Sequence, residues 1–183
     1  MRILLLISIL GVMMNACNNP ENKSNSKEKQ IVSELKFDLP KSEYVILPLD
    51  SSTNWLSSFK NAKPTKLNQS ELVEIEKVIG TAIRENNHKQ NEELIEHNNT
   101  YPDNQLTETG YELKLDGFKR QYVSVINQKG EKEIWINFFC NDWNSDKWKS
   151  ELMIVKDGGN CYFNIKVNLT KKTYSELNIN GNA

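Results

Sequence analysis

Residues 161–169 read CYFNIKVNL, and this stretch settles the architecture because apolar and polar residues alternate along it without a break. A period of two residues is the pattern of a β-strand with one face buried and the other face in solvent. The buried face of the predicted strand carries Cys161, Phe163, Ile165, Val167 and Leu169. The solvent face carries Tyr162, Asn164, Lys166 and Asn168. The C-terminal part of the chain is therefore expected to form a sheet with one buried face.

Further strands are expected on both sides of this segment, separated by short turns. The segments rich in β-forming residues are 111–115, 122–126, 134–139, 151–155 and 177–179. The turn signals between them include DG at 116–117, NQKG at 127–130 and DGGN at 157–160. Short turns make successive strands antiparallel, so we predict a meander. An earlier apolar run, 44–49, contains Pro48 and is expected at an edge of the sheet.

One amphipathic helix precedes the meander and is predicted from residue 69 to about residue 86. Asn68 is suited to cap this helix, and Glu71 completes a capping-box pair with it. The apolar residues that recur at helical spacing are Leu72, Ile75, Ile79, Ala82 and Ile83. The polar stretch 88–99 leaves open whether the helix continues or a loop or second helix takes over. We predict an α+β domain over 37–183 whose helix packs on the sheet, resembling cystatin-like or NTF2-like architectures.

The first seventeen residues predict where in the cell the protein is located. The apolar run 3–14 is too short to span a bilayer, which takes roughly 20 residues, but it is typical of a secretory signal peptide. Ala16 and Cys17 then resemble a bacterial lipobox, although Met14 stands where Leu is usual. We expect residues 1–16 to be removed as a lipoprotein signal peptide and Cys17 to carry the acyl chains that anchor the protein. An uncleaved anchor or an ordinary secretory signal is the alternative.

The segment that follows Cys17 is expected to be a flexible tether spanning residues 17–36. Residues 18–29 read NNPENKSNSKEK, which is too polar to bury enough surface to offset the entropy lost on ordering. The predicted location is the bacterial cell envelope, facing the periplasm or the cell surface, with the membrane as a partner through the lipid. The net charge of −1 provides no basic excess for phosphates, so no nucleic acid partner is expected.

The two remaining cysteines, Cys140 and Cys161, are a candidate disulfide pair because an envelope compartment permits such bridges. Cys140 ends one predicted strand and Cys161 begins the strand two places later. In a plain meander these points lie at opposite ends of the sheet, about 20 Å apart. A disulfide needs Cα atoms within about 7 Å, so a bridge requires another strand order or a sharply bent strand. The sequence therefore leaves open whether Cys140 and Cys161 are bridged or free.

Motifs of known catalytic chemistry are missing from the sequence. It contains no GxSxG, Walker loop, GxGxxG, HExxH or CxxC motif. Its two histidines, His88 and His97, are nine residues apart and would fall on opposite faces of a helix. We interpret both histidines as solvent-exposed, and we expect no catalytic residue, no metal site and no cofactor.

Aromatic residues in the polar loop NDWNSDKWKS (141–150) and on the neighbouring strands are candidate binding residues. Exposed aromatic side chains among polar neighbours are typical of binding hot spots. The candidate set is Trp143, Trp148, Trp135, Tyr122 and Tyr162, with both tyrosines expected on the outer face of the sheet. Alternatively, both loop tryptophans fold over the open end of the sheet and cap the core. We favour this alternative because aromatic side chains usually contribute large buried areas.

Three segments carry a resemblance to other proteins: RQYVSVIN (120–127), KGEKEIWINFFC (129–140) and DGGNCYFNIKVNLT (157–170). They resemble segments of small uncharacterised lipoproteins of Bacteroidota-type bacteria. The resemblance implies a secreted α+β domain and brings no established activity or catalytic residues.

Three kinds of function fit these observations. The leading hypothesis is a non-enzymatic binding module that recognises an envelope protein or glycan. An inhibitor or immunity lipoprotein, which blocks a hostile envelope enzyme or toxin, is the alternative. A hydrolase with an unrecognised site is the third hypothesis, and it predicts a deep pocket lined by convergent titratable groups.

Overall fold

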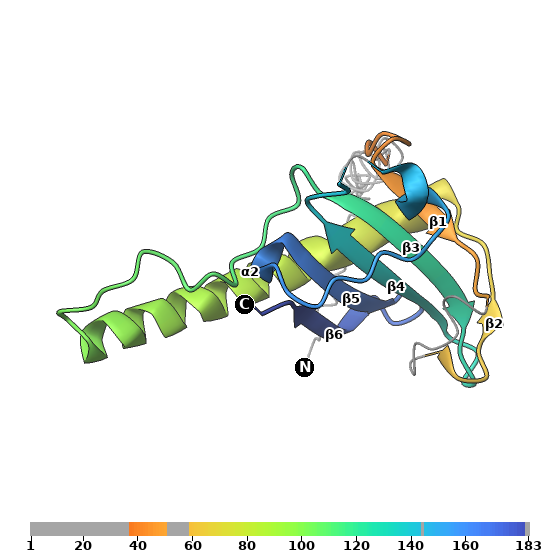
Figure 1. The fold of residues 1–183 in the computed structure, drawn as a ribbon. Helices are drawn as coiled ribbons and strands as arrows, with labels where there is room; N and C mark the ends of the chain where they lie inside the picture. Colours follow the sequence, from red (N-terminus) through yellow and green to blue (C-terminus); the bar gives the residue numbers. More distant parts are fainter. Residues whose placement is uncertain (1–36, 51–58, 144, 182–183) are drawn as a thin grey trace, which may run out of the picture. The chain divides into compact units, whose positions relative to one another are not determined.

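The computed structural model describes residues 37–50, 59–143 and 145–181, which belong to one compact unit. The expected signal peptide, lipidated Cys17 and tether lie outside these ranges. The elements are β1 (Tyr44–Leu47), β2 (Lys63–Pro64), α2 (Gln69–Thr100), β3 (Lys119–Ile126), β4 (Lys132–Phe139), η2 (Asp146–Lys149), η3 (Gly159–Cys161), β5 (Tyr162–Asn168) and β6 (Thr173–Ile179). One long helix packs against a six-stranded, mostly antiparallel sheet, which confirms the predicted α+β class (Figure 1).

The sheet is a meander with an added parallel edge. Its strand order is β1-β3-β4-β5-β6, and β2 pairs with β3 beyond the end of β1. The pairs β3–β4, β4–β5 and β5–β6 are antiparallel, as predicted, whereas β1 runs parallel to β3. The expected edge position of the 44–49 run is confirmed, and β1 ends at Leu47, immediately before Pro48. Proline has no N–H to donate to a ladder, so the strand stops there.

The helix begins where the sequence places it and ends much later. The Asn68 side chain accepts a hydrogen bond from the Glu71 N–H at 3.0 Å, and the Asn68 N–H donates to Glu71 Oε2 at 2.9 Å, so the capping box is present. The helix then runs to Thr100 without a break, so of the possibilities left open for residues 88–99 it is continuation of the helix that the structure has. Among the described helices, none combines the length and apolar character needed to cross a bilayer.

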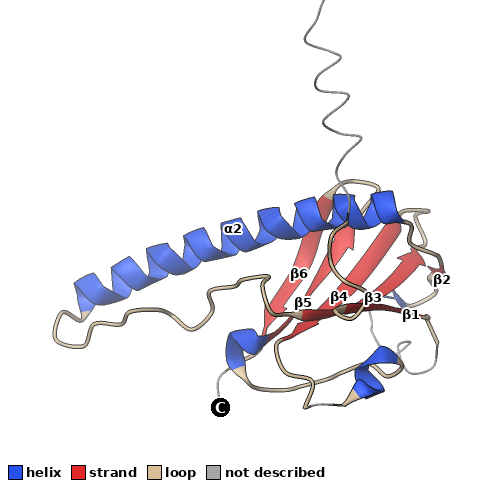
Figure 2. Ribbon diagram, turned by 90° about the horizontal axis from the view of Figure 1, so that it is seen from above, coloured by secondary structure: helices blue, strands red, loops and turns tan. Residues whose placement is uncertain are grey.

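Both faces of the sheet are covered, as Figure 2 shows: α2 lies on one face, and the loop that carries η2 and η3 lies on the other. Gln121, Tyr122 and Val123 are consecutive residues of β3 that point to alternate faces, and all three are 0% exposed. The expectation of one solvated sheet face is therefore wrong for the central strands. The three apolar clusters draw all their members from residues 37–179, so this unit has a core of its own.

Residues 111–115 were expected to form a strand but instead run alongside α2. The Asn87 side chain donates to the Leu113 carbonyl and accepts from the Leu113 N–H, each at 2.8 Å. This paired contact satisfies the backbone of Leu113 as a neighbouring strand would. The alternation in this segment therefore reflects alternate burial against the helix, with Leu113 buried at 5% exposure.

Residues 151–155 also form no strand and instead cross the outer face of the sheet. The Gln121 side chain accepts from the Met153 N–H at 2.9 Å, and Asn137 Nδ2 donates to the Met153 carbonyl at 2.7 Å. Asn180 Nδ2 donates to the carbonyls of Val155 and Asp157 at 2.7 and 2.9 Å. Side-chain amides from β3, from β4 and from Asn180, which follows β6, thus replace the backbone ladder that this segment lacks.

Glu131 joins the β3–β4 turn to the β5–β6 turn. Its carboxylate accepts hydrogen bonds from Lys171 Nζ at 2.7 Å, Asn168 Nδ2 at 2.7 Å and Asn127 Nδ2 at 3.3 Å. These donors, Lys171 foremost, lower the pKa of Glu131 from 4.5 to about 2. A folded-state pKa below the unfolded value stabilises the protein above about pH 4.5, and this contribution is lost as the pH falls towards 2.

We therefore expect Glu131→Gln to destabilise the protein near neutral pH and to matter progressively less as the solution becomes acidic. The measurement is the urea midpoint of wild type and variant at about pH 6 and about pH 2.5. Glu108→Gln, which changes an exposed carboxylate, is the matched control. A midpoint difference that stays constant across this pH range would rule out the coupling.

Candidate functional site

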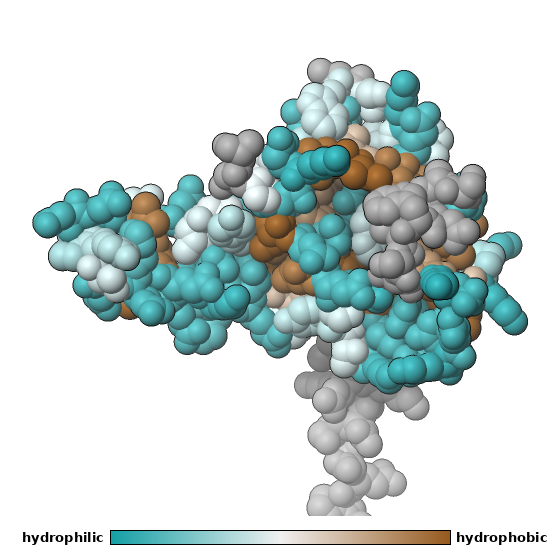
Figure 3. Space-filling view, turned by 60° about the horizontal axis from the view of Figure 1, so that its bottom comes forward, coloured by the Kyte–Doolittle hydropathy of each residue, from teal (hydrophilic) through white to brown (hydrophobic). Residues whose placement is uncertain are grey.

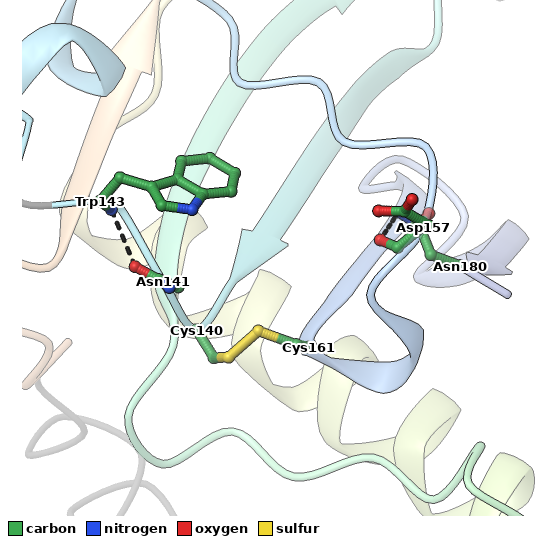
Figure 4. The surroundings of a disulfide bond; sticks show 6 residues. All are labelled: Cys140, Asn141, Trp143, Asp157, Cys161 and Asn180. Carbon is green, nitrogen blue, oxygen red and sulfur yellow. Dashed lines mark hydrogen bonds between the residues drawn. A yellow bond between two sulfur atoms is a disulfide. The ribbon is translucent and has the colours of Figure 1, made fainter. Parts of the chain in front are cut away.

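Cys140 and Cys161 form a disulfide, with their Cα atoms 5.2 Å apart (Figure 4). The expected wide separation required an intervening strand at 151–155, and residues 151–155 form no strand. Because 151–155 crosses the sheet face, β4 pairs directly with β5, and Phe139 lies opposite Tyr162. The two cysteines adjoin this pair, and the Cys140 N–H donates to the Cys161 carbonyl at 3.0 Å.

The disulfide closes a loop whose ends are 21 residues apart in sequence. The buried Gln121 side chain donates to the carbonyls of Trp148 and Glu151 at 2.6 and 2.7 Å. Lys119 Nζ forms an ion pair with Asp142, which ties the beginning of the loop to β3. The loop is thus fixed covalently at its ends and by hydrogen bonds along its length. Such a loop is preorganised, so little conformational entropy remains to be lost when it binds a partner.

Trp143 is the exposed aromatic residue of this loop, with 58% of its surface accessible. Its φ of 50° lies in the left-handed region, which is unusual for a bulky residue. The Trp143 N–H donates to Asn141 Oδ1 at 2.8 Å, which supports this backbone turn. Its indole stacks on the ring of Tyr162, with centroids 5.9 Å apart and planes 14° from parallel. A strained backbone that holds an exposed aromatic side chain is typical of functional sites.

Tyr162 stacks its ring against the Trp143 indole and is itself only 9% exposed. Its ring lies so close to Gly158 that a Cβ added there would sit 2.7 Å from two ring carbons, and Gly158 has a φ of +91°. A glycine is therefore required at position 158 for both conformational and steric reasons. Burial, followed by the nearby charge of Asp157, raises the pKa of Tyr162, so its hydroxyl stays protonated at neutral pH.

The other three candidate aromatic residues lie in the core. Trp148 is 2% exposed and packs edge-on against Phe139, with ring centroids 5.6 Å apart. Trp135 is 6% exposed beneath the loop layer. The favoured alternative, in which the loop tryptophans cap the core, therefore holds for Trp148 and fails for Trp143.

The expected outward position of Tyr122 is wrong, because this side chain points under α2. It is fully buried, and its hydroxyl donates to Glu76 Oε1 at 3.1 Å. The buried Arg120 guanidinium reaches the same carboxylate, with Nη1 and Oε1 2.5 Å apart. Burial, with the added charge of Glu76, raises the pKa of Tyr122 far above its usual value. This cluster fastens the helix to the sheet.

The hollow on the loop face of the sheet is small, at about 70 Å³. Its lining residues are Trp135, Asn137, Met153, Ile154, Val155, Tyr162, Phe163, Asn164 and Asn180. Sites for drug-sized ligands are typically about 300–1,000 Å³, so this hollow suits a few water molecules. It does not provide the deep pocket with convergent titratable groups that the hydrolase hypothesis requires.

The histidines lie apart on the exposed part of α2. His88 Nε2 is 3.5 Å from Glu92 Oε1, and His97 Nε2 is 3.2 Å from the Asn104 carbonyl. In the part of the chain that the structure describes, no three His, Cys, Asp or Glu side chains are grouped so that they could hold a metal ion.

No family model, no curated protein and no solved structure matches this chain. Function is therefore inferred from the geometry of the loop and its aromatic pair, Trp143 and Tyr162.

Proposed function

We propose that this protein is an envelope-anchored binding module that recognises an envelope protein or glycan through Trp143 and Tyr162. The observation that carries this proposal is the exposed indole of Trp143, held over Tyr162 by a turn with positive φ. Exposed tryptophans on rigid supports supply much of the binding energy in many interfaces.

The disulfide supports the proposed location. Disulfides persist in oxidising compartments and are rare in the cytosol, so the Cys140–Cys161 bridge fits a site outside the cytoplasm. In this proposal, residues 1–16 are removed, Cys17 carries the lipid and residues 17–36 tether the domain at 37–183 to the membrane.

An inhibitor or immunity lipoprotein is the second candidate function. It is favoured by the loop between Cys140 and Cys161, which is closed by the disulfide and carries Trp143 near one end. A rigid loop of this kind can enter the cleft of an enzyme without large conformational change. The same surface serves both candidates, and the nature of the bound partner distinguishes them.

Trp143→Ala is expected to weaken binding to isolated cell envelope at least tenfold, which corresponds to about 1.4 kcal/mol, because truncation removes the exposed indole proposed to contact the partner. Co-sedimentation with envelope from the producing cells measures this loss. Protease-treated envelope and purified peptidoglycan sacculi are parallel probes that distinguish a protein partner from a glycan.

The matched control is Ile154→Ala, which removes another exposed apolar side chain, 55% accessible, from the same loop. We expect this variant to bind as the wild type does. Equal binding by wild type and Trp143→Ala, with both proteins folded, would contradict the proposed function.

A further inference from the structure

The second half of α2 and the chain that returns beside it form an arm, defined here as residues 86–111. Figures 1 and 2 both show the helix continuing beyond the edge of the sheet, with the returning loop alongside it. Gln90 is the one buried residue of α2 after Ile83. The arm therefore projects from the domain without an apolar core beneath it.

Polar side chains on one helix face hold the arm together. The Asn98 side chain accepts from the Leu106 N–H at 2.8 Å and donates to the Leu106 carbonyl at 2.9 Å. Thr109 Oγ1 donates to Gln90 Oε1 at 2.5 Å, and Asn86 Nδ2 donates to the Tyr111 carbonyl at 2.9 Å. The returning segment is thus ordered by hydrogen bonds, and ordering it has an entropic cost that apolar burial does not offset.

Four large apolar side chains of the arm are exposed, whereas Leu94 is half-buried. The exposed ones are Ile95, Tyr101, Leu106 and Tyr111, with 53%, 56%, 42% and 38% of their surfaces accessible. Figure 3 shows brown hydrophobic side chains among the teal hydrophilic ones on the arm. A projecting element with ordered backbone and exposed apolar side chains is suited to contact another surface.

The arm is also far more acidic than the rest of the chain. Its acidic residues are Glu92, Glu93, Glu96, Asp103 and Glu108. Lys89 is its one basic residue apart from the histidines, so the arm carries a net charge of −4. The whole chain carries −1, so the remainder carries +3, of which +2 comes from residues 1–36 and +1 from the described residues outside the arm. A surface that complements the arm is therefore basic and partly apolar.

Such a surface lies at the other end of the same domain, beside β1 and β2. A groove of about 530 Å³ runs between residues 46–49 and 64–67 and is mainly apolar, with Ile46 39% exposed. Lys66 lines this groove and is exposed. Lys63, which is also exposed, precedes the lining residue Pro64 in β2. In the described ranges neither lysine side chain makes an ion pair. In Figure 1, β2 and the tip of the arm lie at opposite ends of the domain.

We propose that the arm of one copy docks into the lysine-rimmed groove of a second copy, so that copies associate head to tail. The exposed apolar side chains of the arm enter the groove, while Glu92 and Glu96 face Lys63 and Lys66. A contact between two different surfaces can repeat from copy to copy, which produces rings or open chains. Attachment to one membrane, which belongs to the proposed function, raises the effective concentration of copies, but the docking itself does not require it.

Sedimentation velocity of the chain from residue 18 onwards tests this proposal, because that chain keeps the whole compact unit. From about 10 µM to about 1 mM protein at about 50 mM salt, we expect the weight-average sedimentation coefficient to rise with concentration. At about 500 mM salt it is expected to fall towards the value of a single chain, because salt screens the charged contacts.

A charge swap provides the decisive control. One variant carries Glu92→Lys and Glu96→Lys on the arm, and the other carries Lys63→Glu and Lys66→Glu at the groove. Each variant alone is expected to stay monomeric because like charges then meet. Their mixture is expected to associate, because the reversed arm of the first variant fits the reversed groove of the second.

Circular dichroism and thermal melting check that both variants fold. We expect both to do so, because exposed substitutions of this kind usually change stability by less than about 0.5 kcal/mol. A wild-type chain that remains monomeric at every concentration and salt level overturns the proposal. Undiminished association of the variants, or failure of their mixture to associate, overturns it as well.

Discussion

Replacing Gln121 by alanine is expected to lower the free energy of unfolding by about 4 kcal/mol, the largest effect of any single substitution considered for this protein. The side chain is 0% exposed and uses its full hydrogen-bonding capacity. Its amide nitrogen donates to Trp148 and Glu151, and its oxygen accepts from Asn137 at 3.1 Å and from Met153 at 2.9 Å. Each buried group left without a partner costs about 1–3 kcal/mol.

Urea denaturation of wild type and Gln121→Ala gives the difference directly. Gln128→Ala is the matched control, because the Gln128 side chain is exposed and makes one hydrogen bond, to the Lys60 carbonyl at 3.2 Å. We expect this control to change stability by less than about 0.5 kcal/mol. A Gln121→Ala variant as stable as the Gln128→Ala control would show that the loop layer is not held by this amide.

Replacing both Cys140 and Cys161 by serine is expected to lower the free energy of unfolding by about 3 kcal/mol. The bridge closes a loop with a sequence separation of 21 residues, and the chain entropy that such a closure removes from the unfolded state corresponds to this energy. The loop of the variant is also less constrained where it carries Trp143. We therefore expect envelope binding to fall together with stability.

Thermal melting with and without reductant checks this prediction. Reduction is expected to lower the melting temperature of the wild type and to leave the serine variant unchanged. The serine variant thus serves as the control for unspecific effects of the reductant. Identical melting of the oxidised and reduced wild type would contradict a stabilising bridge.

The fold class was predictable because two of its elements have strong local signals. Asn68 and Glu71 cap a helix through contacts only three residues apart, and the alternation in 161–169 reports the buried face of β5. Both signals depend on neighbours in sequence. They are therefore visible before any tertiary contact is known.

The two wrongly predicted strands, 111–115 and 151–155, show what alternation does not report. A period of two residues indicates alternate burial, but it does not identify the group that satisfies the backbone. At Leu113 that group is Asn87, and at Met153 it is Gln121 together with Asn137. Such side-chain partners lie 16 to 32 residues away, where local patterns carry no information.

The candidate site was predictable only in part. Trp143 and Trp148 lie in one polar loop with similar neighbours, yet one is 58% exposed and the other 2%. Their difference depends on Phe139 and Tyr162, the strand residues on which they pack. The residue overlooked from the sequence was Gln121. Its only sequence signal was that an uncharged amide stands among the large side chains of a predicted strand, at a position where a solvent-exposed residue would more often be charged.

We propose that this protein is lipid-anchored and displays Trp143, on a loop closed by the Cys140–Cys161 disulfide, at an oxidising face of a cell envelope. Intact-mass spectrometry of the protein extracted from the cells that make it, without added reductant, tests this claim most directly. The account predicts a chain that begins at Cys17, carries acyl chains and has Cys140 bonded to Cys161. A chain that retains Met1, lacks acyl chains and carries both thiols free would contradict it.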